Sequence, residues 1–420
     1  PRAFVAAGWV KMQQPMFDTL PALSPTPQAA HALLSAVRPS AYARTRNAID
    51  GAVTGLSPYI THGLLSLPAV LADLDRRHAL DVQHKLVFEL GWRAYFRHVW
   101  QHRGDGILSS LHAGPLPDSA YATELPADIR TACTGVPAVD TAVRTLYATG
   151  TLHNHARMWL ASYVVHLRKV HWRAGADWLY GHLLDGDLAS NHLSWQWVAG
   201  TGSRKPYLFN AENVARHAPA DWHSSGTVID TTYDELDRLC RSPRAVLPQR
   251  HAVSGATATA EPELSRRVPV HTGLGPPSSA QVQGRDVWLV HPWALGALPG
   301  DLPPDTLVLG LWLDDFHQVW AWSPARWDFV QTRMAALAAV QWQGSAAQMA
   351  AALRAARSVR SVDEPHLAPW LPRLAECGAA PTLFAAVERR CDSFSQWWTR
   401  VTRGLHTAAE LLTTPRTAAW

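Results

Sequence analysis

The chain has little cysteine, no long apolar run and no glycine-rich dinucleotide motif. Its four cysteines are scattered and form no C-x-x-C pair, which argues against a metal site and against a dense disulfide framework: Cys133, Cys240, Cys377 and Cys391. A reducing, cytoplasmic location fits this pattern best. No window reaches about 18 consecutive apolar residues, and the N-terminal residues show no basic segment followed by an apolar run. We therefore expect a protein that is neither membrane-bound nor exported.

The chain also lacks a strong excess of either positive or negative charge. The net charge is +4 over 420 residues. Residues 1–235 carry 20 basic and 19 acidic side chains, residues 236–284 carry 6 and 3, and residues 285–420 carry 12 and 12. No half of the chain is basic, so any contact with nucleic acid has to come from a local patch.

Apolar residues at helical spacing dominate the first half of the chain. They recur over residues 80–100, 138–146 and 158–170, and prolines separate the segments. This pattern predicts an all-helical domain over residues 1–236. Most of the twenty tryptophans are expected to be core residues.

The second half of the chain changes character twice. Residues 237–284 are rich in Pro, Ser, Ala, Thr and Gly, which is typical of a linker. Short apolar runs then alternate with helical segments, with strands expected at 287–291, 307–313, 340–342 and 359–362 and helices at 325–339 and 346–357. This alternation predicts an α/β domain with a doubly wound parallel sheet over residues 285–405, followed by a tail, 406–420. No G-x-G-x-x-G follows the first strand, which argues against a dinucleotide site there.

The most informative stretch is DGDLASNHLSWQW, residues 185–197. It combines two acids, an amide and two indoles with few aliphatic side chains. A buried carboxylate costs several kcal/mol unless a partner satisfies it, so this composition indicates a bound group rather than plain packing.

Three further motifs stand in order before it: TGLSPYITHG at 54–63, ELGWRAYFRH at 89–98, and GVPAVDTAVRTLYATG followed by HNHARM within 135–158. Together the four motifs resemble the photolyase and cryptochrome family, whose members bind FAD in an all-helical domain. That family places an α/β antenna domain first, whereas the segment HQVWAWSPARWDFVQTRMAAL, which resembles it, comes second here. The resemblance implies a transposed or permuted domain order and a second chromophore of unknown identity. An unrelated α/β domain is the alternative.

The resemblance implies a set of FAD-binding residues: Tyr42, Thr54, Leu56, Ser57, Arg93, Asn154, Arg157, Asp185, Asp187 and Asn191. A hydroxyl at a helix start suits phosphate oxygens, although Ser57-Pro58 alone is more often a simple helix cap. Arg157 and Asp185 are expected to pair beside the flavin ring, with a structural ion pair as the alternative reading. Asn191 falls nearest flavin N5, where an amide cannot supply a proton as an acid can. This favours an anionic reduced flavin and a repair enzyme.

The resemblance also implies substrate and electron-transfer residues. Contacts to a cyclobutane pyrimidine dimer are expected from Glu89, Trp92, Asn154, Met158 and Trp197, and phosphate contacts from Arg204 and Lys205. Glu89 would stabilise charge on the dimer, so it is a catalytic candidate together with Asn191, Trp195 and Trp172. The two indoles match an electron-transfer chain to the flavin. Its third tryptophan is absent, and Tyr121 or Trp159 is the candidate replacement.

Two functions remain open. The first is a deoxyribodipyrimidine photolyase, a lyase that uses blue light to split dimers in DNA. Few phosphate contacts are expected, so single-stranded DNA should be the preferred partner. The second is a cryptochrome-like photoreceptor that signals through flavin photoreduction. The sequence leaves the oligomeric state undetermined.

Overall fold

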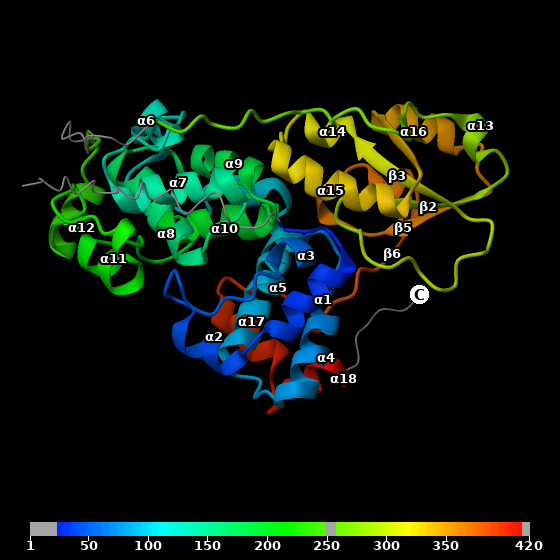
Figure 1. Cartoon of the computed structure of the whole chain (residues 1–420). Coiled ribbons are helices and arrows are strands. Elements are labelled where there is room, and N and C mark those ends of the chain that lie inside the picture. Colours follow the sequence, from blue (N-terminus) through cyan, green and yellow to red (C-terminus); the bar gives the residue numbers. More distant parts are fainter. Residues whose placement is uncertain (1–22, 248–257, 414–420) are drawn as a thin grey trace, which may run out of the picture.

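The computed structural model describes residues 23–247 and 258–413. The chain runs through helices first and reaches the sheet later (Figure 1). The helices before the sheet are α1 (Pro27–Ala36), α2 (Pro39–Thr45), α3 (Ser57–Thr61), α4 (Leu67–His78), α5 (Lys85–Arg103), α6 (Ala127–Arg130), α7 (Pro137–Thr149), α8 (Asn154–Ser162), α9 (Trp172–His182), α10 (Leu188–Ala199), α11 (Ala211–His217) and α12 (Tyr233–Cys240).

Local chemistry decides where these helices begin and end. The predicted helix at 80–100 begins later than expected, at Lys85, because the His84 side chain accepts the N–H of Leu86 and caps it there. The segment predicted at 158–170 is α8 followed by a π-helical turn, Tyr163–Leu167, so one continuous α-helix was wrong. The helix at 138–146 is confirmed as α7, which ends at Gly150 with a φ of 65°.

Within the described residues, six parallel strands form one sheet in the order β1-β4-β3-β2-β5-β6. They are β1 (Leu274–Gly275), β2 (Asp286–Val290), β3 (Leu307–Leu313), β4 (Val340–Gly344), β5 (Ser358–Val362) and β6 (Glu376–Gly378). The parallel sheet and four of its strands are confirmed. The two edge strands were missed because two or three residues are too short to show a pattern. Helices α13 (Ser279–Val282), α14 (Asp314–His317), α15 (Pro324–Leu337) and α16 (Ala346–Leu353) accompany the sheet.

The chain returns to the helical part after the sheet. Helix α17 (Phe394–Val401) packs against α5, and α18 (Glu410–Thr413) lies by α4 (Figure 1). Trp398 lies so close to Gly91 that a Cβ there would be 2.4 Å from its ring. The expected linker contains the end of α12, β1 and α13, while residues 248–257 of it, and 414–420 of the expected tail, lie outside the described residues.

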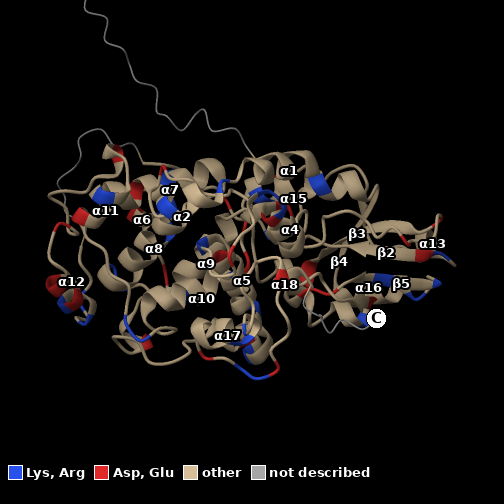
Figure 2. Ribbon diagram, turned by 90° about the horizontal axis from the view of Figure 1, so that it is seen from below, with Lys and Arg blue, Asp and Glu red and all other residues tan. Residues whose placement is uncertain are grey.

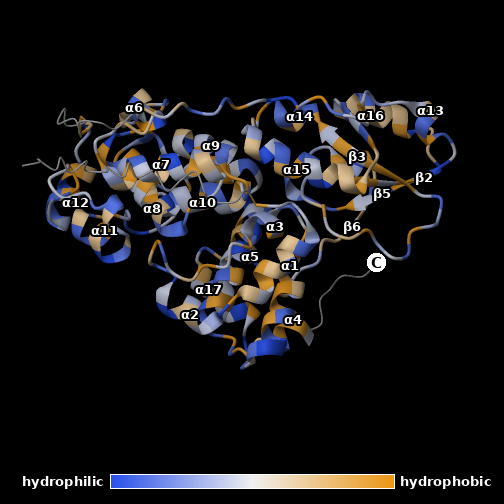
Figure 3. Ribbon diagram, viewed as in Figure 1, coloured by the Kyte–Doolittle hydropathy of each residue, from blue (hydrophilic) through white to orange (hydrophobic). Residues whose placement is uncertain are grey.

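Apolar side chains gather in two cores. One, within 129–236, belongs to α7–α12, and the other joins α1, α4 and α5 to the whole sheet and to α17. Strands β2 and β3 are largely hydrophobic, whereas the helices are striped (Figure 3). Basic and acidic residues are interleaved along the ribbon (Figure 2), as the charge balance predicts. Within residues 23–247 and 258–413, no helix combines the length and the apolar character needed to cross a membrane.

Candidate functional site

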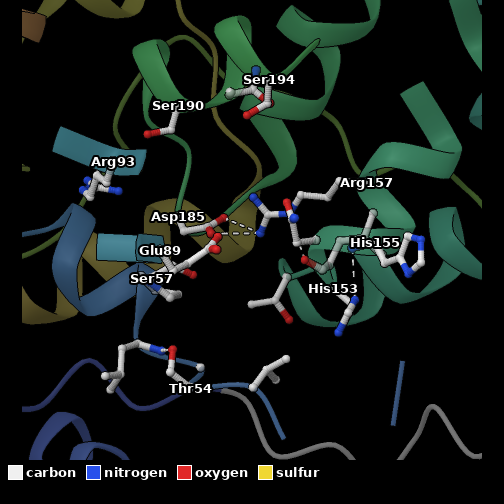
Figure 4. Close-up of a pocket in the computed structure, with 18 of the residues that line it drawn as sticks. Thr54, Ser57, Glu89, Arg93, His153, His155, Arg157, Asp185, Ser190 and Ser194 are labelled. Carbon is white, nitrogen blue, oxygen red and sulfur yellow. Dashed lines mark hydrogen bonds and ion pairs between the residues drawn. The ribbon is translucent and has the colours of Figure 1, made fainter. Parts of the chain in front are cut away.

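A cavity of about 1350 Å³ opens between α3, α5, α8 and α10 (Figure 4). Its lining contains every predicted site residue except three. The predicted residues that line it are Tyr42, Thr54, Leu56, Ser57, Glu89, Trp92, Arg93, Asn154, Arg157, Met158, Asp185, Asp187, Asn191, Trp195 and Trp197. Trp172 lies behind the wall, and Arg204 and Lys205 are exposed outside it. Residues more than 150 positions apart are thus brought to one cavity.

The predicted pair of Arg157 and Asp185 is present at the wall of the cavity (Figure 4). Nη2 of Arg157 lies 2.9 and 2.8 Å from the two carboxylate oxygens, and its Nε donates to the carbonyl of Leu152 at 2.8 Å. Burial alone would raise the pKa of Asp185, but the guanidinium outweighs it and holds that pKa below its ordinary value. Asp185 is therefore ionised and the arginine keeps a fixed orientation.

Asp187 has a different partner. Its side chain is fully buried, and one oxygen accepts the N–H of Ser190, capping α10. The other accepts from Nη2 of Arg97 at 2.6 Å, while Arg93 stands 3.6 Å away. The sequence interpretation missed Arg97, although it lies four residues after Arg93 on α5 and so shares its face.

Glu89 faces the open cavity from α5, beside Tyr42 and Arg46. The protein around it withdraws the carboxyl from bulk water, and this desolvation raises its pKa despite the nearby guanidinium. A carboxyl in that position binds a proton more readily than an ordinary glutamate does.

Three predicted residues lie in contact with α9 or on it. Nδ2 of Asn191 donates to the carbonyl of Ala176 at 2.8 Å, which fixes the amide. Trp195 is buried against Gly175, where a Cβ would lie 2.3 Å from the indole. Trp172 begins α9, and its Nε1 donates to Ser110 at 2.9 Å. Trp195 still lines the cavity, whereas Trp172 does not.

Ring contacts separate the two candidates for the third electron-transfer position. The ring of His171 lies 5.6 Å from Trp172 and 6.2 Å from Tyr121, and Tyr121 is half-buried. Trp159 is fully buried; its ring lies 4.5 Å from that of His155 at the cavity wall and packs further out against Phe209 and Trp222.

Aromatic side chains mark the rim of the cavity. Trp197 is 39% exposed and lies 5.8 Å from the ring of Tyr207. Trp92 also lines the cavity, with one ring face stacked on Phe394 of α17 at 4.1 Å. Only its other face can meet a ligand. Asn154 lies against Met158, with Nδ2 and Sδ 3.9 Å apart.

Ser190 is a lining residue that the motifs did not single out. Its hydroxyl oxygen is buried and has no hydrogen-bond partner among the described residues, although it lies at the cavity (Figure 4). Buried hydroxyls without a partner are rare, and bound water or a bound ligand is the usual explanation. The ion pair of Arg157 and Asp185 gives this largely apolar cavity fixed polar groups that can orient a bound cofactor.

Comparison with known proteins identifies a family model for the residues around the cavity. Residues 86–251, which contain most of the cavity wall, match the model of the FAD binding domain of DNA photolyase. This match, together with the relatives described below, supports the photolyase and cryptochrome family for this part of the chain. FAD is accordingly the cofactor of this site, and the polar groups and volume of the cavity fit it.

Relatives within the photolyase and cryptochrome family carry two kinds of name. A cryptochrome DASH of Ostreococcus tauri is 33% identical over 207 residues, covering 47% of this chain and 37% of the relative. A deoxyribodipyrimidine photo-lyase of Streptomyces griseus is 36% identical over 152 residues, covering 36% of this chain and 33% of the relative. The chain therefore spans little more than a third of these relatives' lengths. A solved Synechocystis cryptochrome matches with 29% identity and a TM-score of 0.41, covering 50% of this chain and 48% of that one.

Proposed function

We propose that this protein repairs cyclobutane pyrimidine dimers in DNA by light-driven electron transfer. The observation that carries the proposal is the shared cavity: Glu89, Trp92, Asn154, Met158 and Trp197 line the same space as the predicted flavin residues. Bound FAD, once reduced and excited by blue light, would supply the electron. Because both sets of residues line one cavity, a dimer flipped out of the DNA can lie directly beside the cofactor, with no protein between them.

Each substrate residue has a separate task in this proposal. The exposed indole of Trp197 at the rim offers a flat surface for a flipped base, and the free face of Trp92 offers a second one. Glu89 holds a base edge and stabilises the charge that develops as the dimer opens. Its raised pKa lets it act as a hydrogen-bond donor at low pH and as an acceptor at higher pH.

Light-driven reduction of the flavin is proposed to use a chain of aromatic side chains that pass electrons inward. Trp195 at the wall and Trp172 behind it form the first two positions, and Tyr121, linked through the ring of His171, is the outer one. The ring contacts support Tyr121 over Trp159. Asn191, whose amide cannot supply a proton, favours the anionic reduced state.

The DNA partner is proposed to be single-stranded by preference. Arg204 and Lys205 are exposed in the loop after α10 and stand outside the cavity, where they can meet phosphates. Two cations contribute little of the energy needed to unpair a duplex, which costs a few kcal/mol per step.

The domain assignment is part of the proposal. We assign residues 1–236 to the helical FAD domain, 237–284 to the linker, 285–405 to the α/β domain and 406–420 to the tail. The α/β domain corresponds to the family's antenna domain in a transposed position, and a second chromophore there stays a prediction.

The direct test is a repair assay. Reduced, FAD-loaded protein is mixed with a single-stranded oligonucleotide that carries one cyclobutane dimer and is exposed to blue light, with a dark sample as control. We expect restored pyrimidines only in the light, and slower repair in the matching duplex. Light-driven reduction of the flavin without repair of either substrate would contradict the proposal.

That outcome would favour the second candidate, a blue-light photoreceptor. One observation supports it: Asp187 at the cavity is tied through Arg97 to Glu364 beside the sheet, at 2.6 and 2.8 Å. A change in the charge of the flavin would therefore reach the α/β domain through Asp187, Arg97 and Glu364.

A further inference from the structure

Two side chains at the carboxyl end of the sheet, Glu364 and His366, connect to the wall of the cofactor cavity through Arg97 and the backbone of Leu188. Arg97 is shared between two carboxylates: its Nη2 donates to Asp187 and its Nη1 donates to Oε1 of Glu364 at 2.8 Å. Glu364 follows β5, which pairs with β2 on one side and β6 on the other. Burial alone would raise the pKa of Glu364, but Arg97 outweighs it and holds that pKa at about 2. Both carboxylates are therefore ionised.

His366 extends the contacts of Arg97 and Glu364 back to the start of α10. Its Nδ1 lies 2.5 Å from Oε1 of Glu364, and its Nε2 lies 3.2 Å from the backbone nitrogen of Leu188, the first residue of α10. A backbone N–H can only donate, so Nε2 is the acceptor and Nδ1 carries the proton. Burial holds the pKa of His366 below its ordinary value, which agrees with this neutral form. The series of contacts therefore starts at Asp187 and ends at the adjacent residue, Leu188.

The imidazole has little freedom to leave this position. It stacks on Trp293 at 4.4 Å and meets the edge of Trp100 of α5 at 4.9 Å, and it is 3% exposed. The first N–H of a helix has no partner within the helix, so His366 satisfies a group that would otherwise be unpaired in the interior. One residue of the α/β domain thereby caps the helix that carries Asn191, Trp195 and Trp197.

We propose that Glu364 and His366 are positioning residues for the flavin: they fix Asp187 and the first turn of α10, and through them the cavity wall. Side chains at a site hold their geometry only when a supporting shell locks them, and displacements of about 1 Å are costly. The α/β domain therefore controls cofactor affinity and redox behaviour through contacts of its own, whether or not it carries a second chromophore. This proposal rests on FAD as the cofactor and is independent of DNA repair.

The test compares three variants of the full chain loaded with FAD. His366→Leu removes both hydrogen bonds, and His366→Gln keeps one donor and one acceptor about as far apart as the two ring nitrogens. His317→Leu is the matched control, because His317 is also 3% exposed and packs between Trp322 and Trp327, and its Nδ1 lies near the carbonyl of Trp320 rather than at the start of α10. The readouts are the Kd for FAD, the flavin midpoint potential and the melting temperature.

We expect His366→Leu to raise the Kd for FAD at least about tenfold and to shift the midpoint potential. His366→Gln should recover most of both properties, and the control should lose melting temperature alone. If His366→Leu does not fold, Glu364→Gln provides the same comparison, since it weakens the hold on Arg97 while keeping the shape. An unchanged Kd and potential in the folded variant, or equal changes in the His317 control, would overturn the proposal.

Discussion

At the scale of single residues, the ion pair of Arg157 and Asp185 is the clearest contact in the cavity wall. Asp185→Ala leaves the guanidinium without its partner, and we expect a loss of about 3 kcal/mol in the free energy of unfolding. The low end of the usual range applies because a quarter of the Arg157 side chain is exposed. FAD retention should fall with it, measured from the flavin absorbance per chain after gel filtration.

A second ion pair gives the control for that experiment. Asp128→Ala removes the partner of the buried Arg168, whose two nitrogens lie 2.6 and 3.0 Å from the carboxylate, away from the cavity. The Asp128→Ala variant should lose a similar free energy of unfolding and keep the same FAD content. Equal flavin loss in both variants would mean that Asp185 acts only on the fold.

Tyr121 carries a prediction about electron supply. Tyr121→Phe keeps the ring beside His171 but removes the phenolic proton that an oxidised tyrosine must release, so photoreduction of bound FAD should slow. Trp159→Phe should leave the rate unchanged, because the ring that links to Trp172 is that of His171, which contacts Tyr121, whereas Trp159 packs against His155, Phe209 and Trp222. The initial rate of flavin bleaching under blue light, with an external reductant, measures both. A slower rate only in the Trp159 variant would assign the outer position to that residue.

Glu89 carries a prediction about pH. Its pKa is raised, so it becomes protonated at a higher pH than an ordinary glutamate does. We expect the repair rate to fall as the pH is lowered through this pKa, because the protonated group loses the charge that helps the dimer open. In Glu89→Gln the rate should be low and nearly independent of pH over the same range. A wild-type profile parallel to that of the variant would show that another group titrates.

These residues also show what sequence reasoning could and could not supply. The motifs identified Arg157 and Asp185 as partners because the resemblance carries both positions. They missed Arg97, Glu364 and His366, since a contact between residue 97 and residue 364 depends on how the two halves pack. Ser190 was missed for another reason: a serine in the first turn of a helix has an ordinary local use, and only the cavity distinguishes it.

At the scale of elements, the contact of α17 with α5 is the feature most open to test. Gly91→Ala would place a Cβ 2.4 Å from the ring of Trp398, so the two helices must separate. We expect a loss of about 1–3 kcal/mol in stability from overpacking, together with a changed environment for Trp92, which stacks on the same helix. Urea unfolding and tryptophan fluorescence measure the two effects.

Gly106 gives the control for this contact. A Cβ there would come no closer than 3.7 Å to any neighbour, so Gly106→Ala should change neither quantity. If both variants behave alike, the contact of α17 with α5 does not restrain the cavity wall.

Element prediction succeeded where a pattern was long enough to read. Strands β2, β3, β4 and β5 were found from their apolar runs, and α7 from its spacing. The start of α5 was misplaced because a histidine cap at His84 is weaker evidence in a sequence than Ser, Thr or Asp would be. The return of α17 to α5 could not be inferred, since nothing local marks the partner of an amphipathic helix.

At the scale of the whole molecule, most of the helices that line the cofactor cavity precede the sheet in the chain. The segment that follows β5 then contacts the residues behind the cavity wall through Arg97 and Leu188. The core that contains α5 also contains all of the larger strands, which binds the two halves into one hydrophobic unit. The sequence predicted the parallel sheet and the helical region separately. It could not predict that Asp187 and Glu364 would share one arginine, because that depends on how the two regions dock.

The measurement that tests repair most directly is single-turnover repair of one cyclobutane dimer in a single-stranded oligonucleotide, by reduced wild type and Glu89→Gln side by side. Both proteins should hold the same amount of FAD. The wild type should restore the pyrimidines under blue light, and the variant should do so at least about tenfold more slowly, because an amide keeps the shape but loses the charge. No repair by flavin-loaded wild type, or equal rates in the two proteins, would contradict the proposed role of this cavity.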